Sequence, residues 1–133
     1  MQMFDVQAIE ISAPVRKVFE FVRDPGNLPR WAHAFRSVTA GRARLETPAG
    51  AVDIGLHTNA EHTAGTVDWR LEFPDGSVGL AQSRVTETAR GTSIYSFVLH
   101  APPVPLEKLE GALAAQRLTL QNELLELKSI LET

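Results

Sequence analysis

Alternation of apolar and polar positions dominates the first two-thirds of the chain and predicts an antiparallel sheet. Branched residues alternate with polar ones over 4–11, which indicates an opening strand with one buried face. From residue 37 to 100, short runs rich in Val, Thr, Leu and aromatic residues are separated by Gly, Pro, Asp and Asn. This texture predicts further strands joined by tight turns. We place them near 37–46, 51–61, 66–73, 77–87 and 92–100, which makes about six strands in all.

Helical spacing of apolar residues predicts two short helices between the first two strands. The first follows Ser12, which we expect to cap it, and runs from Pro14 to Val22. The segment 24–27 contains Asp, Pro, Gly and Asn and ends that helix. A second short helix then continues to Phe35.

A third, longer helix is predicted from Pro105 to Leu131. Proline suits its first turn, and a stripe of leucines follows at helical spacing, interrupted at Gln116 and Arg117. The leucines of the stripe are Leu106, Leu109, Leu113, Leu120, Leu124, Leu127 and Leu131. A helix of this length would be roughly 40 Å long, enough to cross the sheet. The fold class is therefore predicted to be α+β.

Composition narrows the class of protein. The chain has 133 residues, 44% of them hydrophobic and 22% charged, which is typical of one globular domain over 1–133. It contains no cysteine, which excludes disulfides, thiolate nucleophiles and iron–sulfur clusters. The net charge of −3 with no basic stripe argues against nucleic-acid binding. Without a long apolar run or a signal-peptide pattern, we expect a cytoplasmic protein with no membrane insertion.

Turn residues predict which side chains share a face of the sheet. If Asp75-Gly76 is a two-residue hairpin loop, Trp69 lies opposite Gln82, and Val67 lies opposite Arg84, all facing inward. A buried guanidinium needs a carboxylate, a carbonyl, water or a ligand as partner. In an alternative interpretation, Arg84 lies near the open end of the sheet and extends outward as a surface residue.

A second turn at Ala64-Gly65 is predicted in the same way. It places Leu56 and His62 on the face shared with Trp69. A three-residue loop over 63–65 would move these side chains to the opposite face, so both registers stay open at this point.

The N-terminal third resembles a known superfamily. The sequence from Ile9 to Val22 contains an Ala-Pro followed by Val-Phe, and the break over 24–29 is followed by Trp31 in a Pro-x-Trp arrangement. Together with the order of elements over the whole chain, this resembles the START and polyketide cyclase superfamily (SRPBCC), which includes the birch-pollen allergen type. The resemblance implies a helix-grip fold, in which a curved antiparallel sheet wraps around the long C-terminal helix. It also implies a cavity used for lipids, sterols, hormones or polyketide-like molecules, and in some members for cyclisation or dehydration, with no invariant catalytic set to carry over.

We therefore predict that the chain binds a small hydrophobic molecule between the sheet and the C-terminal helix. The alternative is a cyclase or dehydratase acting on a carbonyl in the same cavity, with Tyr95, His62 or Arg84 as catalytic candidates. The predicted ligand-binding residues are Trp31, Phe35, Leu56, Trp69, Leu71, Gln82, Arg84, Tyr95, Phe97, Leu109, Leu113 and Arg117.

Other chemistries are not indicated. The four histidines, His33, His57, His62 and His100, lie on separate predicted elements without metal-ligand spacing, so we predict no metal site. Neither a phosphate-binding loop nor a nucleophile elbow occurs, so we expect no nucleotide cofactor and no serine-hydrolase activity.

The oligomeric state is predicted to be a monomer or a homodimer paired through a sheet edge. Polar positions along the C-terminal helix form what we interpret as an ordinary solvated face, which argues against an extensive helix–helix interface. These positions are Gln121, Glu123, Glu126 and Lys128.

Overall fold

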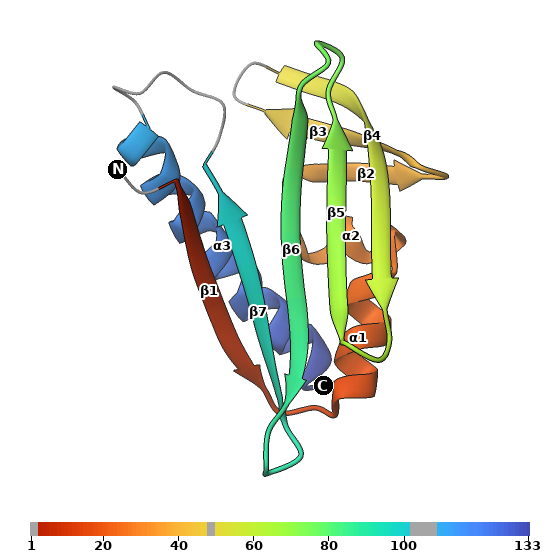
Figure 1. Cartoon of the computed structure of the whole chain (residues 1–133), viewed down its shortest axis with the longest axis vertical. Helices are drawn as coiled ribbons and strands as arrows, with labels where there is room; N and C mark the ends of the chain where they lie inside the picture. Colours follow the sequence, from red (N-terminus) through yellow and green to blue (C-terminus); the bar gives the residue numbers. More distant parts are fainter. Residues whose placement is uncertain (1–2, 48–49, 102–108) are drawn as a thin grey trace.

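Seven antiparallel strands form one sheet, and the helices lie against one of its faces (Figure 1). The structure is a computed structural model that describes residues 3–47, 50–101 and 109–133. The elements in chain order are β1 (Phe4–Ile11), α1 (Val15–Arg23), the 3₁₀ turn η1 (Pro25–Asn27), α2 (Leu28–Trp31), β2 (Phe35–Thr39), β3 (Arg42–Thr47), β4 (Gly50–Glu61), β5 (Thr66–Glu72), β6 (Val78–Glu87), β7 (Ser93–His100) and α3 (Leu109–Leu131). The predicted α+β fold with a long C-terminal helix is confirmed.

The strand order is β1-β7-β6-β5-β4-β3-β2. Each strand from β2 to β7 pairs with its neighbour in the chain, and β1 closes the order by pairing with β7. Figure 1 shows β2 and β3 running across the direction of β5 and β6, so the sheet bends strongly at this end. The bend brings β2 toward α2, with which it is in contact.

The strand predicted over 37–46 is two strands. A two-residue loop, Ala40 and Gly41, separates β2 from β3, and Thr39 pairs with Arg42 across it. Both loop residues have positive φ, 24° and 80°, as the tight hairpin turn that suits twisted strands requires. Alanine rarely takes this conformation, so the turn lacks the usual Asn-Gly or Asp-Gly signal and the strand count was predicted one too low.

The helix boundaries differ from the prediction in two places. Helix α1 begins after Pro14 with no side-chain cap, and the predicted cap, Ser12, donates its backbone N–H to Glu132 at 2.7 Å instead. Helix α2 ends at Trp31, because Ala32 is already extended and Phe35 begins β2. The second short helix was therefore predicted four residues too long.

Helix α3 packs along β1 and against α2. Its buried leucines join the side chains of α1, α2 and the inner face of the sheet in one core. These leucines are Leu120, Leu124, Leu127 and Leu131; Leu113 is also buried. The predicted helix start at Pro105, and Leu106, lie outside the described residues.

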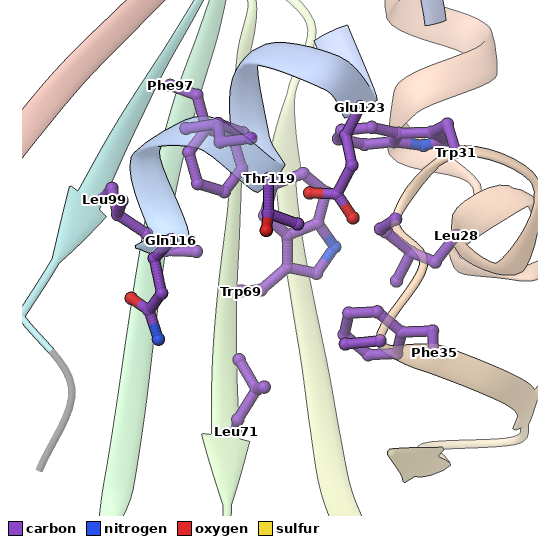
Figure 2. Close-up of a pocket in the computed structure, with 14 residues that line it drawn as sticks. Leu28, Trp31, Phe35, Trp69, Leu71, Phe97, Leu99, Gln116, Thr119 and Glu123 are labelled. Atoms are coloured by element: carbon purple, nitrogen blue, oxygen red, sulfur yellow. The ribbon is translucent and has the colours of Figure 1, made fainter. Parts of the chain in front are cut away.

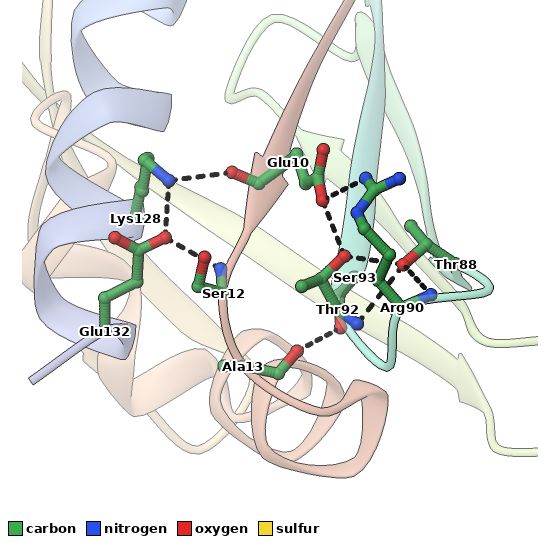
Figure 3. Close-up of polar contacts among 9 residues, drawn as sticks. All are labelled: Glu10, Ser12, Ala13, Thr88, Arg90, Thr92, Ser93, Lys128 and Glu132. Atoms are coloured by element: carbon green, nitrogen blue, oxygen red, sulfur yellow. Dashed lines mark hydrogen bonds and ion pairs between the residues drawn. The ribbon is translucent and has the colours of Figure 1, made fainter.

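Polar contacts hold the C-terminal end of α3 to the end of β1 (Figure 3). Lys128 donates to the backbone carbonyl of Glu10 at 3.0 Å and pairs with Glu132. On the neighbouring strand, the hydroxyl of Ser93 donates to the carbonyl of Ala13 at 2.7 Å, and Ser93 is fully buried. Together with the leucines, the contact from Lys128 to Glu10 holds α3 against β1.

The hairpin between β5 and β6 determines which side chains face α3. The Phe73 N–H donates to the Ser77 carbonyl at 2.9 Å, and the Gly76 N–H donates to the Phe73 carbonyl at 3.0 Å, so the loop has three residues. Gly76 takes the left-handed position with φ 88°. Relative to the predicted two-residue loop, the register moves by one and every β6 side chain changes face.

The turn between β4 and β5 also differs from its prediction, but the difference does not change which side chains face inward. Four residues, 62–65, form the loop, and the Gly65 N–H donates to the Glu61 carbonyl at 2.9 Å. The register differs from the prediction by two residues, which leaves the faces unchanged. The prediction that Leu56 shares a face with Trp69 is therefore confirmed, and both are buried.

Candidate functional site

A pocket of about 270 Å³ lies between the sheet, α2 and α3 (Figure 2). Most of its lining is apolar: the residues are Leu28, Trp31, Ala32, Ala34, Phe35, Trp69, Leu71, Ala81, Phe97, Leu99, Gln116, Thr119, Leu120 and Glu123. Gln116 and Thr119 are exposed on α3, so the rim of the pocket reaches solvent there. A partly open apolar concavity with a few polar groups is the common form of a small-molecule site.

Aromatic side chains form the walls. Trp69 stacks on Phe97 with ring centroids 6.0 Å apart, and Trp31 meets Tyr95 edge to face at 6.0 Å. Trp31 is placed here because Pro29 lies in the first turn of the short helix α2 and the chain becomes extended directly after the tryptophan.

Small residues keep the space between these rings open. Ala81 on β6 lies directly opposite Trp69 on β5, and Ala32 and Ala34 follow Trp31. A larger side chain at any of these positions would extend into the pocket. The pocket thus results from large aromatic rings placed beside alanines.

Both tryptophan N–H groups in the wall are buried and have no hydrogen-bond partner among the residues that the structure describes. A buried donor without an acceptor is unfavourable, and native proteins satisfy most such groups. Surrounding protein atoms cover both N–H groups, so they are unsatisfied donors of the core and do not face the pocket.

Glu123 is the ionisable residue of the lining. Its carboxylate accepts the backbone N–H of His33 at 2.6 Å, and in Figure 2 it points from α3 into the pocket above Trp69. Burial raises the pKa of Glu123, while His33 lowers it and Glu126 raises it further. A carboxyl group whose charge is poorly compensated in an apolar surrounding is suited to bind a donor or to transfer a proton.

Five of the predicted ligand-binding residues come together in the pocket wall. They are Trp31, Phe35, Trp69, Leu71 and Phe97. Three others, Leu56, Tyr95 and Leu113, are buried but do not line the pocket. The side chain of Leu109 lies outside what the structure describes.

The prediction that Gln82 and Arg84 face inward is wrong. The three-residue hairpin loop turns Ala81 and Ser83 inward and places Gln82 and Arg84 on the outer face. Arg84 donates to the Ala64 carbonyl at 3.0 Å, and Gln82 contacts His100. Arg84 is therefore a surface residue, as the alternative interpretation in the sequence analysis expected.

Arg117 and His62 also lie away from the pocket. Arg117 forms an ion pair with Asp5 at 2.9 Å, and Arg117 does not line the pocket. His62 stands in the β4–β5 turn with 69% of its side chain exposed, where its ring contacts Phe19 and pairs with Glu20 at 3.5 Å. Its predicted inward orientation is wrong, because the longer turn removes His62 from the sheet.

The three catalytic candidates therefore do not meet at one point. Tyr95 is buried in the core, and burial raises its pKa far above the usual value, with a smaller lowering by the neighbouring Ser83 hydroxyl. His62 and Arg84 are exposed on other parts of the surface. No bound atom can lie within hydrogen-bond reach of all three.

Glu123, Gln116 and Thr119 are the polar pocket residues that the sequence analysis did not select. We interpreted Glu123 as part of a solvated face and Gln116 as an interruption of the leucine stripe. Their spacing carried a signal, since 116, 119, 120 and 123 recur at helical intervals and include the buried Leu120.

The comparisons with known proteins agree with this architecture. The sequence model of the family described as polyketide cyclase / dehydrase and lipid transport matches residues 3–132. The chain belongs to this family. The resemblance found in the N-terminal motif is therefore confirmed, while no curated protein matches the chain.

Solved structures with a similar fold can be aligned with nearly all of the chain. A START superfamily protein from Mycobacterium smegmatis has 12% identity and TM-score 0.65, with coverage of 92% of this chain and 94% of that one. An uncharacterized protein from Bacillus thuringiensis has 16% identity and TM-score 0.71, covering 96% and 98%. The di-domain ARO/CYC BexL from the BE-7585A biosynthetic pathway has 17% identity and TM-score 0.69, covering 96% of this chain and 46% of BexL. At these identities the likeness shows the fold alone.

No helix within the described ranges is long and apolar enough to cross a membrane.

Proposed function

We propose that this protein binds a small, largely apolar molecule in the pocket between the sheet, α2 and α3. The observation that carries the proposal is the pocket of about 270 Å³, with four aromatic rings and only a few polar groups in its wall. The four rings belong to Trp31, Phe35, Trp69 and Phe97. Family membership supports it, because the family is described by lipid transport as well as by cyclase and dehydrase chemistry.

The pocket volume limits the size of the ligand. A dry apolar cavity of about 150 Å³ holds one benzene molecule. The pocket described here is nearly twice as large, so a compact molecule of about two fused rings fits it.

A cavity-filling variant tests this proposal. Ala81→Leu extends a side chain into the pocket opposite Trp69, whereas Ala115→Leu makes the same change on the exposed side of α3. Binding of naphthalene derivatives, followed by isothermal titration calorimetry, should weaken at least ~tenfold in Ala81→Leu and stay unchanged in Ala115→Leu, since the first variant removes the space that the ligand occupies. Equal affinity in both variants would place the ligand elsewhere.

A carbonyl-directed reaction of the cyclase or dehydratase type is the second candidate function. Glu123 favours it, because burial raises the pKa of this carboxyl group toward the range where proton transfer is efficient. Dehydration of a β-hydroxy ketone requires removal of the α proton and loss of the hydroxyl as water. In this reaction Glu123, and none of the three candidates chosen from the sequence, would transfer the proton.

The test is conversion of a β-hydroxy naphthyl ketone to the enone, followed by its ultraviolet absorbance. A loss of kcat by roughly 100-fold or more in Glu123→Gln, with unchanged turnover in Tyr95→Phe, is the expected result. Absence of turnover above the buffer rate in the unmodified protein would leave binding as the function.

A further inference from the structure

The charge of the pocket wall has one sign. Glu123 is the one ionisable side chain among the lining residues, and none of the residues in that lining is a lysine, arginine or histidine. Two basic side chains beside this region pair with other carboxylates: Arg117 pairs with Asp5, and His33 pairs with Glu126. A ligand with a carboxylate would thus add a second negative charge with no basic side chain in the lining to offset it.

The carboxylate of Glu123 has an unused acceptor. One of its oxygens, Oε2, takes the backbone N–H of His33, and no hydrogen bond reaches Oε1 from any residue that the structure describes. Figure 2 shows this group pointing into the space between Trp69 and Leu28. A donor on the ligand can complete the coordination of the carboxylate from inside the pocket.

The aromatic walls suit a positive charge as well as a ring. An ammonium group within about 6 Å of the face of a tryptophan, tyrosine or phenylalanine ring is attracted by the ring electrons, most strongly by tryptophan. Trp69 and Trp31 lie in the same wall that Glu123 faces. A carboxylate and aromatic rings around one space are complementary to a cation with an apolar body.

We propose that the ligand is a compact aromatic amine, bound as its ammonium ion by Glu123 with the ring system held among Trp31, Phe35, Trp69 and Phe97. This inference rests on the proposed function, because it identifies the chemical class of the molecule in the same pocket. The ammonium donates to Oε1 of Glu123, and the pocket discriminates against carboxylic acids of the same shape.

Three probes of equal ring size test the inference: naphthyl ethylamine, naphthyl ethanol and naphthyl acetic acid. Calorimetric titration at neutral pH should give the amine an affinity at least ~tenfold above that of the alcohol, and the acid the weakest affinity of the three, as expected for a charge-assisted hydrogen bond with ring contact. In Glu123→Gln the amine and the alcohol should bind within about threefold of each other, since a neutral amide makes no charge-assisted bond.

Two internal controls separate a loss of charge from a loss of structure. Glutamine retains an oxygen that accepts the His33 N–H, so Glu123→Gln should lose much more affinity for the amine than for the alcohol. Glu126→Gln changes a carboxylate that pairs with His33 outside the pocket lining, and it should leave the order of the three probes unchanged.

The outcomes are distinct. If the alcohol binds the unmodified protein as tightly as the amine, or if Glu123→Gln keeps the full preference for the amine, the amine inference is overturned while the apolar site stands. If none of the three probes binds, the proposed function is overturned, and this inference with it.

Discussion

The carboxylate of Glu123 on α3 accepts a hydrogen bond from the backbone N–H of His33, in the segment between α2 and β2, at 2.6 Å. Ala32 and Ala34, on either side of His33, line the pocket. One side chain therefore both faces the pocket and ties its α2 wall to its α3 wall. The ionisation of Glu123 thus bears on the stability of this region as well as on binding.

Replacement of Glu123 should change how stability depends on pH. Burial raises the pKa of Glu123 in the folded protein, so its contribution to the free energy of unfolding is fully present below the ordinary value of 4.5 and is lost as the pH rises through the raised pKa. Glu123→Gln lacks this loss. Urea denaturation should therefore show the variant more stable, relative to the unmodified protein, at pH 8 than at pH 4.

Comparing the variant with the unmodified protein at each of the two pH values cancels the contributions of other titrating groups. Lowered pKa values at Asp5, through its hydrogen bond from Gln7, and at Glu10, through Thr92 and Arg90, make stability fall as the pH drops in both proteins alike. The same stability difference between variant and unmodified protein at both pH values would contradict the prediction.

Tyr95→Phe should leave stability unchanged or raise it by up to about 1 kcal/mol. The Tyr95 hydroxyl is buried and has no hydrogen-bond partner of good geometry in the part of the chain that the structure describes, so its removal relieves a desolvated polar group. Ser83→Ala is the opposite case, because the Ser83 hydroxyl donates to the Val67 carbonyl at 2.6 Å, and it should cost about 1–2 kcal/mol. Chemical denaturation measures both; a clear loss in Tyr95→Phe would reveal a partner for the hydroxyl.

Gly65→Ala should destabilise the protein by at least ~3 kcal/mol. Gly65 has φ 72°, and a Cβ there would lie 2.5 Å from the carbonyl oxygen of Val85, whose own N–H donates to Gly65 at 2.8 Å. The added carbon would push apart the contact that fixes the β4–β5 turn to β6.

Gly76→Ala is the matched comparison for this variant. Its φ of 88° is similarly left-handed, but no atom lies within 4 Å of the position of a Cβ, so only the backbone strain of about 1–2 kcal/mol applies. Thermal unfolding of the two variants measures the difference. Equal losses would show that the Val85 contact does not matter.

Much of the fold follows from local patterns. The helical spacing from Val15 to Val22 and the leucine stripe from Leu113 to Leu131 correspond to helices that bury most of those residues, and five of the six predicted strands lie within two residues of observed ones. These patterns are reliable because each element buries one face of its own, whatever its partner. The split at Ala40 was missed because alanine gives no turn signal.

The site depended on relationships that a linear pattern does not contain. One additional residue in the loop before Ser77 moved Gln82 and Arg84 to the outer face, since side chains alternate with a period of two. Likewise, Glu123 lies at the boundary of the apolar face of α3, and only the docking of that helix against α2 and the sheet decides whether it meets solvent or the pocket.

The sequence by itself thus determined most of the elements, their order, the family and most of the aromatic residues that gather inside. Only the tertiary structure decided which polar side chains line the pocket beside those rings. The reason is that the rotation of a helix about its own axis and the register of a hairpin are set by packing between distant segments. A change of one residue in register exchanges a glutamine for an alanine beside Trp69, and a change of one position around the helix exchanges solvent for a carboxylate in the pocket.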